Sequence, residues 1–538
     1  MKTTKNEIVD SNIISAEKSA GSGGFLKSAA LLTVGGIAAK IIGAVYRIPL
    51  TNMLGAYGIG LYQLAFPLYA LLVTLSAAGI PTAVSKIVAE KTEKGDYAGA
   101  KSCFRCALMV LSGIGFVFGG ILFAFAEILA TVQNTPELAA AYRVVAAAIP
   151  AECVTAAFKG WFHGRMNMKP TAISQIIEQV VKAAVGLIAV SLCLPDVLSA
   201  VYAAVAAVTA SETAGLIVTV GIYLFGEKRP KNREERREFS ELDMKKELKT
   251  LLACALPMTL SAIVLPVAHL IDSLMVQKLI GLENRTELYG LWSGPVHSLI
   301  TMPSVLITGV AASVVPGMAR SCAAGDGKGV ADKLNLSMAL SFGISLPSAF
   351  GLAFLSEEVC GLLYPGFSGA DADIFAKLLT VGSGSIIFMS VLMTANSVLQ
   401  ANGKFYIPVI ALTAGSAVKC AMDFFLYRAD AINIYEEAFS HIACNLVACI
   451  VNMWYIKKKL GLRTDWTDVC LRPLAATCAM TLFIVLAKAF MPFSRTKTGT
   501  ILVIAGAGIV YLTVLAVFWR EKIRFFVSDR KRKRASAQ

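Results

Sequence analysis

Long apolar segments recur along the whole 538-residue chain, separated by short polar segments. A helix needs about 20 mostly apolar residues to cross a hydrocarbon layer about 30 Å thick. By this criterion the pattern predicts about fourteen spans, near residues 27–50, 62–85, 104–129, 139–160, 170–193, 198–225, 250–276, 289–317, 334–355, 375–399, 405–427, 434–456, 469–491 and 500–519. Lipid offers no partner to backbone polar groups, so spans of this length fold as helices. The sequence therefore predicts an all-α polytopic membrane protein.

The first twelve spans repeat one pattern twice. Features of the first half recur in the second at separations of 235–239 residues: Phe66-Pro67 with Met302-Pro303, Ile80-Pro81 with Val315-Pro316, and Gly164, Pro170 and Lys182 with Gly403, Pro408 and Lys419. So constant an offset indicates a duplication. Each copy has six spans, so both copies start on the same side of the membrane, and a pseudo-two-fold axis along the membrane normal would relate them. We expect two pseudo-symmetric six-helix lobes around a central cavity, with two further C-terminal helices.

This organisation divides the chain into six parts. They are a disordered cytoplasmic N-terminus (1–24), a first lobe (25–226), a basic cytoplasmic linker (227–249), a second lobe (250–460), helices thirteen and fourteen (461–519) and a basic tail (520–538). No loop is long enough to fold as a catalytic domain, so we expect a protein that is not an enzyme.

Basic residues lie almost entirely on alternate loops. On the opposite loops only Lys278, Arg285, Arg428, Arg495 and Lys497 are found. Short loops rich in Lys and Arg stay cytoplasmic, which predicts a cell-membrane protein with both termini in the cytoplasm. The net charge of +14 then faces anionic membrane lipids and not nucleic acid, because no separate basic domain exists.

No motif indicates a metal or a cofactor. Cys103-Phe-Arg-Cys106 is the only CxxC sequence, and no second pair completes a zinc site. The Gly325–Gly329 segment lacks the spacing of a phosphate-binding loop. We expect no cofactor and a monomer.

Charged residues inside predicted spans are the candidate site. Lys40 and Arg47 lie seven residues apart, on nearly the same face of the first span. A charge at membrane depth costs at least about 2.5 kcal/mol, so it normally faces a cavity or a partner. The alternative for Arg47 is an extended side chain that reaches the outer interface.

Two further pairs, Glu178/Lys182 and Lys419/Asp423, have i,i+4 spacing at equivalent places in the two repeats. Each pair either lines a polar cavity or neutralises itself while bridging helices. Weaker candidates, for ion coupling, are Glu152, Glu212 and the i,i+3 pair His269/Asp272, which could instead form a structural hydrogen bond.

Two stretches resemble a known family. They are Leu54-Gly-Ala-Tyr-Gly-Ile-Gly-Leu-Tyr62 through Gly79-Ile-Pro-Thr-Ala-Val-Ser-Lys86, and Gly160-Trp-Phe-His-Gly-Arg-Met-Asn-Met-Lys-Pro170 followed by Ser174-Gln-Ile-Ile-Glu-Gln-Val-Val-Lys182. The sequence is similar here to the stage V sporulation protein B group of lipid-linked oligosaccharide exporters. That group is related to the lipid II flippases and, more distantly, to multidrug and toxin extruders.

The resemblance implies a flippase for an undecaprenyl-pyrophosphate-linked oligosaccharide or peptidoglycan precursor, with roles in polysaccharide or cell-wall biogenesis or sporulation. Arg47 would then bind pyrophosphate through its planar fork, and it matches an arginine in the first helix of the lipid II flippases. A second arginine of those flippases, in helix eight, is replaced here by Ser298. Two alternatives stay open: a cation-coupled multidrug antiporter of the same superfamily, and a membrane-embedded enzyme.

Overall fold

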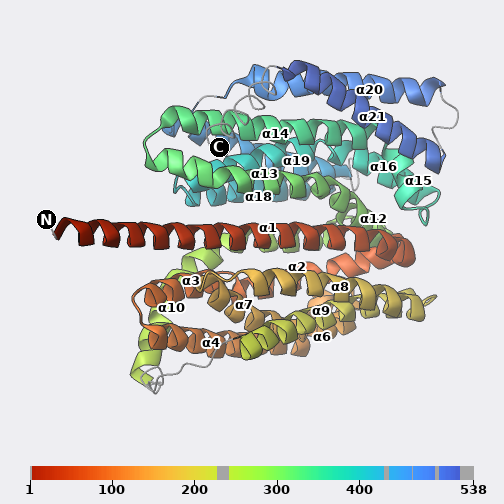
Figure 1. The fold of residues 1–538 in the computed structure, drawn as a ribbon. Helices are drawn as coiled ribbons and strands as arrows, with labels where there is room; N and C mark the ends of the chain where they lie inside the picture. Colours follow the sequence, from red (N-terminus) through yellow and green to blue (C-terminus); the bar gives the residue numbers. More distant parts are fainter. Residues whose placement is uncertain (1–2, 227–240, 429–434, 463, 491–495, 521–538) are drawn as a thin grey trace. The chain divides into compact units, whose positions relative to one another are not determined.

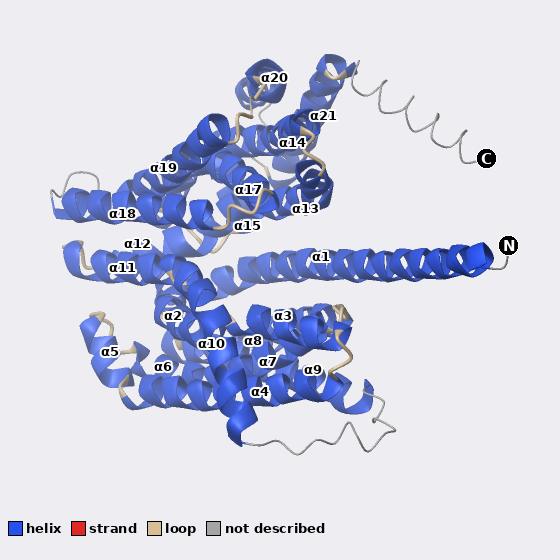
Figure 2. Ribbon diagram, turned by 90° about the vertical axis from the view of Figure 1, so that its left-hand side faces the viewer, coloured by secondary structure: helices blue, strands red, loops and turns tan. Residues whose placement is uncertain are grey.

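The computed structural model describes residues 3–226, 241–428, 435–462, 464–490 and 496–520. Within these ranges the chain forms helices and loops, and no strand (Figure 2). Eleven helices are long and apolar enough to cross a membrane, or twelve if Ala370–Gly382 and Ser385–Ala401, bent by 42°, make one span. The prediction of an all-α, multi-span membrane protein is confirmed.

The number of spans depends on one unusually long segment. Residues Leu31–Glu93 form a single 63-residue candidate for crossing the membrane. A helix of this length extends about 95 Å, or about three membrane thicknesses. The segment therefore has room for both of the spans predicted near 27–50 and 62–85. The total of fourteen stays a prediction.

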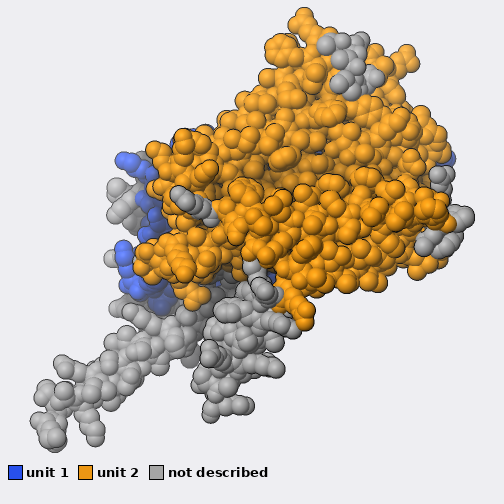
Figure 3. Space-filling view, turned by 90° about the horizontal axis from the view of Figure 1, so that it is seen from above, with its two compact units in different colours: residues 1–46, 64–270 blue, residues 47–63, 271–538 orange. Residues whose placement is uncertain are grey.

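The chain forms two compact units, coloured separately in Figure 3. Unit 1 comprises residues 1–46 and 64–270, and unit 2 comprises residues 47–63 and 271–538. The boundaries therefore fall inside helices, and none of them lies in the linker 227–249. Residues 47–63 belong with the second unit, and residues 250–270, which the repeat pattern assigns to the second lobe, belong with the first.

The helices of the first half are coloured from red to yellow-green in Figure 1. They are α1 (Thr3–Leu64), α2 (Phe66–Ala77), α3 (Ile80–Glu93), α4 (Tyr97–Ala124), α5 (Ala126–Val132), α6 (Leu138–Ala146), α7 (Ala148–Gly164), α8 (Lys169–Cys193), α9 (Val197–Gly226) and α10 (Glu241–Ala262). Helix α8 packs along α9, while α7 contacts α3, α4 and α9. Most of the linker, residues 227–240, lies outside the described residues.

Helix α1 differs from its prediction at both ends. It begins at Thr3, so residues 3–24 continue the first span as helix where composition predicts disorder. An existing helix extends one hydrogen bond at a time without a new nucleus, which favours this continuation. At the other end Gly55 has φ +68°, a conformation that glycine adopts at little cost, and the helix kinks there.

The second half has a matching set of helices. They are α11 (Val264–Leu279), α12 (Arg285–Leu291), the π-helical turn η2 (Trp292–Val296), α13 (His297–Ala323), α14 (Gly327–Phe354), α15 (Ser356–Leu363), α16 (Ala370–Gly382), α17 (Ser385–Ala401), α18 (Tyr406–Arg428) and α19 (Tyr435–Lys459). The π-helical turn η3 (Thr467–Leu471), α20 (Arg472–Phe490) and α21 (Lys497–Phe518) follow. The tail beyond residue 520 lies outside the described residues.

Matching helix caps support the duplication. Asp96 accepts a hydrogen bond from Gly99 N (2.8 Å) at the start of α4, and Asp326 accepts one from Gly329 N (2.9 Å) at the start of α14. A carboxylate at the N-cap satisfies a backbone donor that the helix itself cannot. In each copy a glycine of positive φ, Gly95 or Gly325, precedes the aspartate. Two loops of the same design, 230 residues apart, are expected of repeated units.

The C-terminal part of α1 is fastened within unit 2. Asn52 donates to Leu363 O (2.8 Å) and accepts from Gly366 N (3.1 Å), which ties α1 to the loop after α15. At Gly60 a Cβ atom would lie 2.1 Å from Thr286 O, so only glycine permits this approach of α1 to α12. These contacts place residues 47–63 firmly in the second unit.

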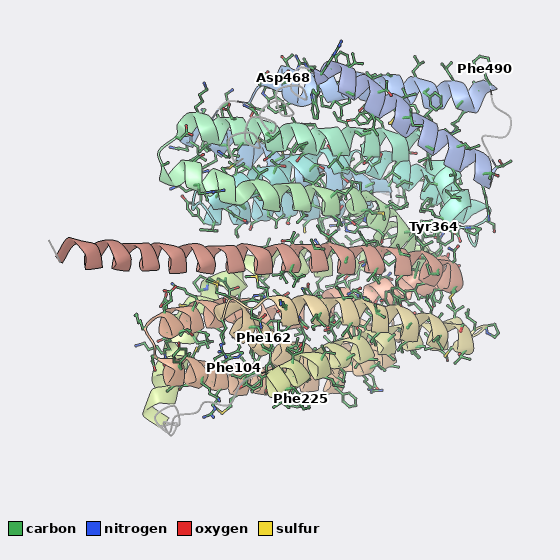
Figure 4. All side chains as sticks on the ribbon, in the orientation of Figure 1. Phe104, Phe162, Phe225, Tyr364, Asp468 and Phe490 are labelled. Atoms are coloured by element: carbon green, nitrogen blue, oxygen red, sulfur yellow. The ribbon has the colours of Figure 1, made fainter. Side chains whose placement is uncertain are left out.

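Apolar side chains are found both inside the units and on their surfaces. Phe104 of α4 and Tyr364 after α15 are buried, whereas Phe225 at the end of α9 is exposed (Figure 4). Many other large apolar side chains are exposed along α4, α8, α9 and α21. Such a surface suits lipid and not water.

Candidate functional site

Arg47 is an exposed cation on α1, within unit 2. Its Nη1 donates a hydrogen bond to Ser298 Oγ (2.8 Å) on α13, and this hydroxyl in turn donates to Gly294 O (2.6 Å). No carboxylate forms an ion pair with Arg47 among the residues that the structure describes. The guanidinium is therefore held on one side and keeps most of its donors for another partner.

Lys40 lies two turns earlier on α1, in the part of the helix that belongs to unit 1. It is also exposed, and no ion pair to it is found within the described residues. The two cations predicted from the first span thus lie on one helix, and neither is neutralised by a neighbouring carboxylate of the described chain.

Lys419 is at the centre of a buried charge cluster in unit 2. Its Nζ lies 2.8 Å from Asp423 Oδ2, 2.8 Å from Glu437 Oε1 and 2.9 Å from Asp272 Oδ2. These four residues, from α11, α18 and α19, are called the Lys419 cluster below. The predicted i,i+4 pair of Lys419 with Asp423 forms, and Asp272, predicted from a different span, joins it.

Glu437 is the member of the Lys419 cluster that sequence reasoning missed. The only signal was a pair of acids, Glu436 and Glu437, inside the last span of the second lobe. His269, the suggested partner of Asp272, is exposed one turn earlier on α11, whereas Asp272 is buried. The two side chains of the predicted His269/Asp272 pair thus lie in different surroundings.

A second charge cluster lies in unit 1, around Lys159 of α7. Lys159 Nζ is 3.3 Å from Glu152 Oε1 and 3.9 Å from Glu178 Oε1. Glu212 of α9 lies close enough to Glu152, Glu178 and Lys159 for their charges to interact. Glu178 also accepts a hydrogen bond from Ser174 Oγ (2.5 Å), within α8. Lys159, Glu152, Glu178 and Glu212 are called the Lys159 cluster below.

Lys159 is a further functional candidate that the sequence analysis did not select. Its signal was the seven-residue spacing from Glu152, which places both charges on one face of α7. Lys182 lies one turn beyond Glu178 on α8 and is half-buried. Although Lys182 and Lys419 are equivalent in the repeat, the lysine at the centre of the unit 1 cluster is Lys159.

The two clusters have the same composition, one lysine and three carboxyl groups, but are assembled from non-equivalent positions. The Lys419 cluster is buried, whereas Lys159, Glu152 and Glu212 are only partly buried. Lysines held by several carboxylates resist displacement, because separating either partner leaves an uncompensated charge. No such ion pair to Arg47 or Lys40 is found among the described residues. The arrangement thus offers two exposed cations on α1 that can bind an anion and two clusters whose charge can change with protonation. No group of three or more potential metal ligands is found in the described ranges.

Comparison with protein families decides the relationship. The model of a family described as polysaccharide biosynthesis proteins matches residues 25–322, more than half of the chain. The chain belongs to this family. A second model, for the lipid II flippase MurJ, matches residues 232–504, again just over half. The resemblance seen in the sequence is confirmed, and the matched flippase family consists of transporters.

Similar proteins are found in Bacillus subtilis (strain 168). Stage V sporulation protein B is 26% identical over 509 residues, which cover 92% of this chain and 95% of that protein. Lipid II flippase MurJ is 26% identical over 461 residues, covering 81% and 83%. The uncharacterized membrane protein YabM is 28% identical over 450 residues, covering 82% and 81%.

Solved structures show the same fold. An inward closed structure of lipid II flippase MurJ superposes with a TM-score of 0.69 at 16% identity, covering 92% of this chain and 99% of that one. An inward-facing multidrug resistance transporter of the MATE family gives 0.67 at 15% identity, covering 78% and 94%. At these identities the likeness concerns the fold alone.

Proposed function

We propose that this polysaccharide biosynthesis family member is a flippase. It carries a lipid-linked oligosaccharide or peptidoglycan precursor, attached through undecaprenyl pyrophosphate, across the bacterial cytoplasmic membrane. Its relatives in Bacillus subtilis, one of which is named a lipid II flippase, support a substrate of this class. The substrate's pyrophosphate is the group that the protein must bind inside an otherwise apolar environment.

Arg47 carries this proposal. A cation inside a membrane span costs several kcal/mol unless a partner compensates it, and Ser298 supplies only a neutral acceptor. An anionic ligand would supply the missing charge. A guanidinium suits pyrophosphate because its planar set of donors binds two oxygens at once. Lys40, on the same face of α1, would add a second positive charge.

The lysines of the two clusters, Lys419 and Lys159, fit a different role. To contact a substrate directly, Lys419 would have to leave three carboxylates within 2.9 Å. Lys159 would likewise have to leave Glu152 and Glu178. We assign both clusters to holding helices together and to ion coupling. Lys182 on α8 stays a predicted substrate-binding residue.

Transport would proceed by alternating access, in which the site opens to one side of the membrane and then to the other. The fold shared with inward-facing and inward closed transporters supports this mechanism. Disulfide crosslinks between the cytoplasmic ends of the two units should then stop transport, and reduction should restore it. A crosslinked protein of full activity would count against alternating access.

Reconstituted vesicles test the substrate and Arg47 together. Full-length protein should move a short-chain polyprenyl-pyrophosphate-linked sugar between leaflets. Arg47→Ala should reduce the rate at least thirtyfold, since an unpaired phosphate costs about 2–5 kcal/mol. Arg47→Lys should recover only part of it. The matched control is Arg143→Ala, which removes an exposed arginine that is 2.6 Å from Glu127 and should leave transport unchanged.

The results separate two kinds of failure. If wild-type protein moves no lipid-linked sugar, the substrate class is wrong. If wild-type and Arg47→Ala protein transport equally well, the substrate class stands and the role of Arg47 is wrong.

A cation-coupled multidrug antiporter is the second candidate. The buried carboxyl groups Asp272 and Asp423 favour it, because antiporters need acids that exchange a cation for the drug. Mass spectrometry of lipids that co-purify with the protein distinguishes the candidates. A polyprenyl-linked glycan supports the flippase, whereas its absence together with pH-driven efflux of cationic dyes supports the antiporter.

A further inference from the structure

The Lys419 cluster has an imbalance of charge. Three carboxyl groups surround one ammonium group, so the cluster would carry a net charge of minus two if every acid were ionised. All four residues are buried: the exposed fractions are 4% for Asp272, 5% for Lys419, 0% for Asp423 and 3% for Glu437. A net charge of this size is too costly to keep away from water, and buried acids become neutral instead.

Hydrogen bonding distinguishes the three acids. Both oxygens of Glu437 accept hydrogen bonds, Oε1 from Lys419 Nζ (2.8 Å) and Oε2 from Tyr427 OH (2.8 Å). Asp272 and Asp423 each contact Lys419 through Oδ2 alone. Oδ1 of each is buried and has no hydrogen-bond partner. These hydrogen bonds therefore stabilise Glu437 as an anion. Asp272 and Asp423 each have a buried oxygen without such a bond, which suits a neutral carboxyl group better.

Among the described residues, Lys419 is the cation that forms ion pairs with these acids, and the exposed His269 lies one turn before Asp272 on α11. Titratable groups that interact with the cluster include Tyr289 of α12, Cys420 and Tyr427 of α18 and Cys444 of α19, all ordinarily neutral at pH 7. Glu436 is a further buried acid on α19. His441, one turn beyond Glu437, packs against the rings of Trp292 and His297. Protons are the remaining way to balance the charge.

We propose that the Lys419 cluster is a proton-binding site, in which Asp272 and Asp423 take up and release protons while Glu437 and Lys419 remain an ion pair. With both aspartates protonated the cluster is neutral, and each proton released leaves one uncompensated negative charge. Proton binding follows from the charges of the cluster itself. Its use as the coupling ion of transport rests on the proposed flippase function.

A proton fits this site better than sodium. The centre of the three carboxyl groups, where a metal cation would bind, is already filled by Lys419 Nζ at 2.8–2.9 Å from each acid. The ammonium acts as a permanent tethered cation. The charge that varies must therefore be a proton on an aspartate.

The position of Asp272 explains how protonation could affect transport. Helix α11 passes from unit 1 to unit 2 between Leu270 and Ile271, so Asp272 lies in the first turn that belongs to unit 2. Its bond to Lys419 attaches this turn to α18. Loss of a proton would change the strength of that attachment in a helix that has residues in both units.

Infrared spectroscopy of the purified full-length protein tests proton binding without transport. A protonated carboxyl group absorbs separately from a carboxylate, so wild-type protein at pH 7 should show a carboxylic acid band. Asp272→Asn and Asp423→Asn should each reduce this band, and the double variant should reduce it further. Asparagine keeps the shape of aspartate and still accepts from Lys419. The control is Asp373→Asn, an exposed aspartate paired with Lys377, which should leave the band unchanged.

Proteoliposomes then test coupling. An imposed pH gradient should change the wild-type flipping rate severalfold, a sodium gradient should not, and both asparagine variants should lose the pH response. An unchanged infrared band in the double variant would overturn the proton site. A reduced band with an intact pH response would overturn its coupling role. If wild-type protein transports no lipid-linked sugar, the proposed function fails while the infrared result still decides proton binding.

Discussion

Arg47 and Ser298 lie 251 residues apart in the chain, and their side chains are joined by a hydrogen bond of 2.8 Å. The serine occupies the place where the resemblance to lipid II flippases suggests a second arginine. A neutral acceptor in place of a cation orients Arg47 without repelling it. The interaction thus positions the one arginine that the flippase proposal requires, at the cost of one positive charge in the site.

Replacing Ser298 with alanine should weaken substrate binding without abolishing transport. The guanidinium keeps its charge but loses its fixed acceptor, which for an exposed charged hydrogen bond corresponds to about 1 kcal/mol, or about fivefold in affinity. Ser298→Thr should restore it, because threonine retains the hydroxyl. Substrate titration of flipping in vesicles measures the effect. Ser304→Ala is the control, since the Ser304 hydroxyl donates to Thr301 O of its own helix. An equal effect of both changes would refute a positioning role.

Gly215→Ala should disrupt the Lys159 cluster. A Cβ at this position would lie 2.4 Å from Glu178 Oε1 and 2.6 Å from its Cγ, so the glutamate would have to move. Overpacking of this kind costs about 1–3 kcal/mol. Thermal unfolding in detergent should show a lower midpoint than wild type. Gly221→Ala on the same helix has nothing within 4 Å of the new methyl group and should be neutral; equal midpoints for both variants would contradict the packing argument.

How far the sequence could predict this protein depends on the type of pattern. Apolar segments and basic loops are local, and they predict helices and the duplication well. The pair of Lys419 with Asp423 is also local, because i,i+4 spacing on one helix brings the groups together, and it forms at 2.8 Å. The kink at Gly55 and the membership of residues 47–63 in unit 2 depend instead on contacts with distant helices.

Partners on other helices could not be predicted in the same way. Glu178 has a partner that i,i+4 spacing does not predict: its ion pair with Lys159 reaches across from α8 to α7. Glu437 reaches Lys419 because α19 packs along α18 and turns the face that carries Glu437 toward it. Such a rotation is set by the packing of whole helices, and no spacing within one helix encodes it.

The predicted topology can be measured by single-cysteine labelling in intact cells, on a background without the twelve native cysteines. The alternation of basic loops predicts that positions 232 and 328 are cytoplasmic and that position 283 is external. Lys328 and Glu283 are exposed, so accessibility does not limit labelling there. An impermeant reagent should label position 283 alone in intact cells and all three after permeabilisation. Labelling of 232 or 328 before permeabilisation would reverse the orientation.

Lys419→Met should severely destabilise the protein, because it removes the counter-ion of Glu437 and the donor shared by three acids. Breaking a buried pair on one side costs about 3–5 kcal/mol, whereas removing both charges is often nearly neutral. Lys419→Met combined with Glu437→Gln should therefore be more stable than Lys419→Met alone, and thermal unfolding of the two single variants and the double variant measures this coupling. Lys377→Met is the control: its pair with Asp373 is exposed and should contribute less than about 1 kcal/mol. If the double variant is no more stable than Lys419→Met, the Glu437–Lys419 ion pair is not the permanent core of the cluster, and the division of roles among its acids must be abandoned.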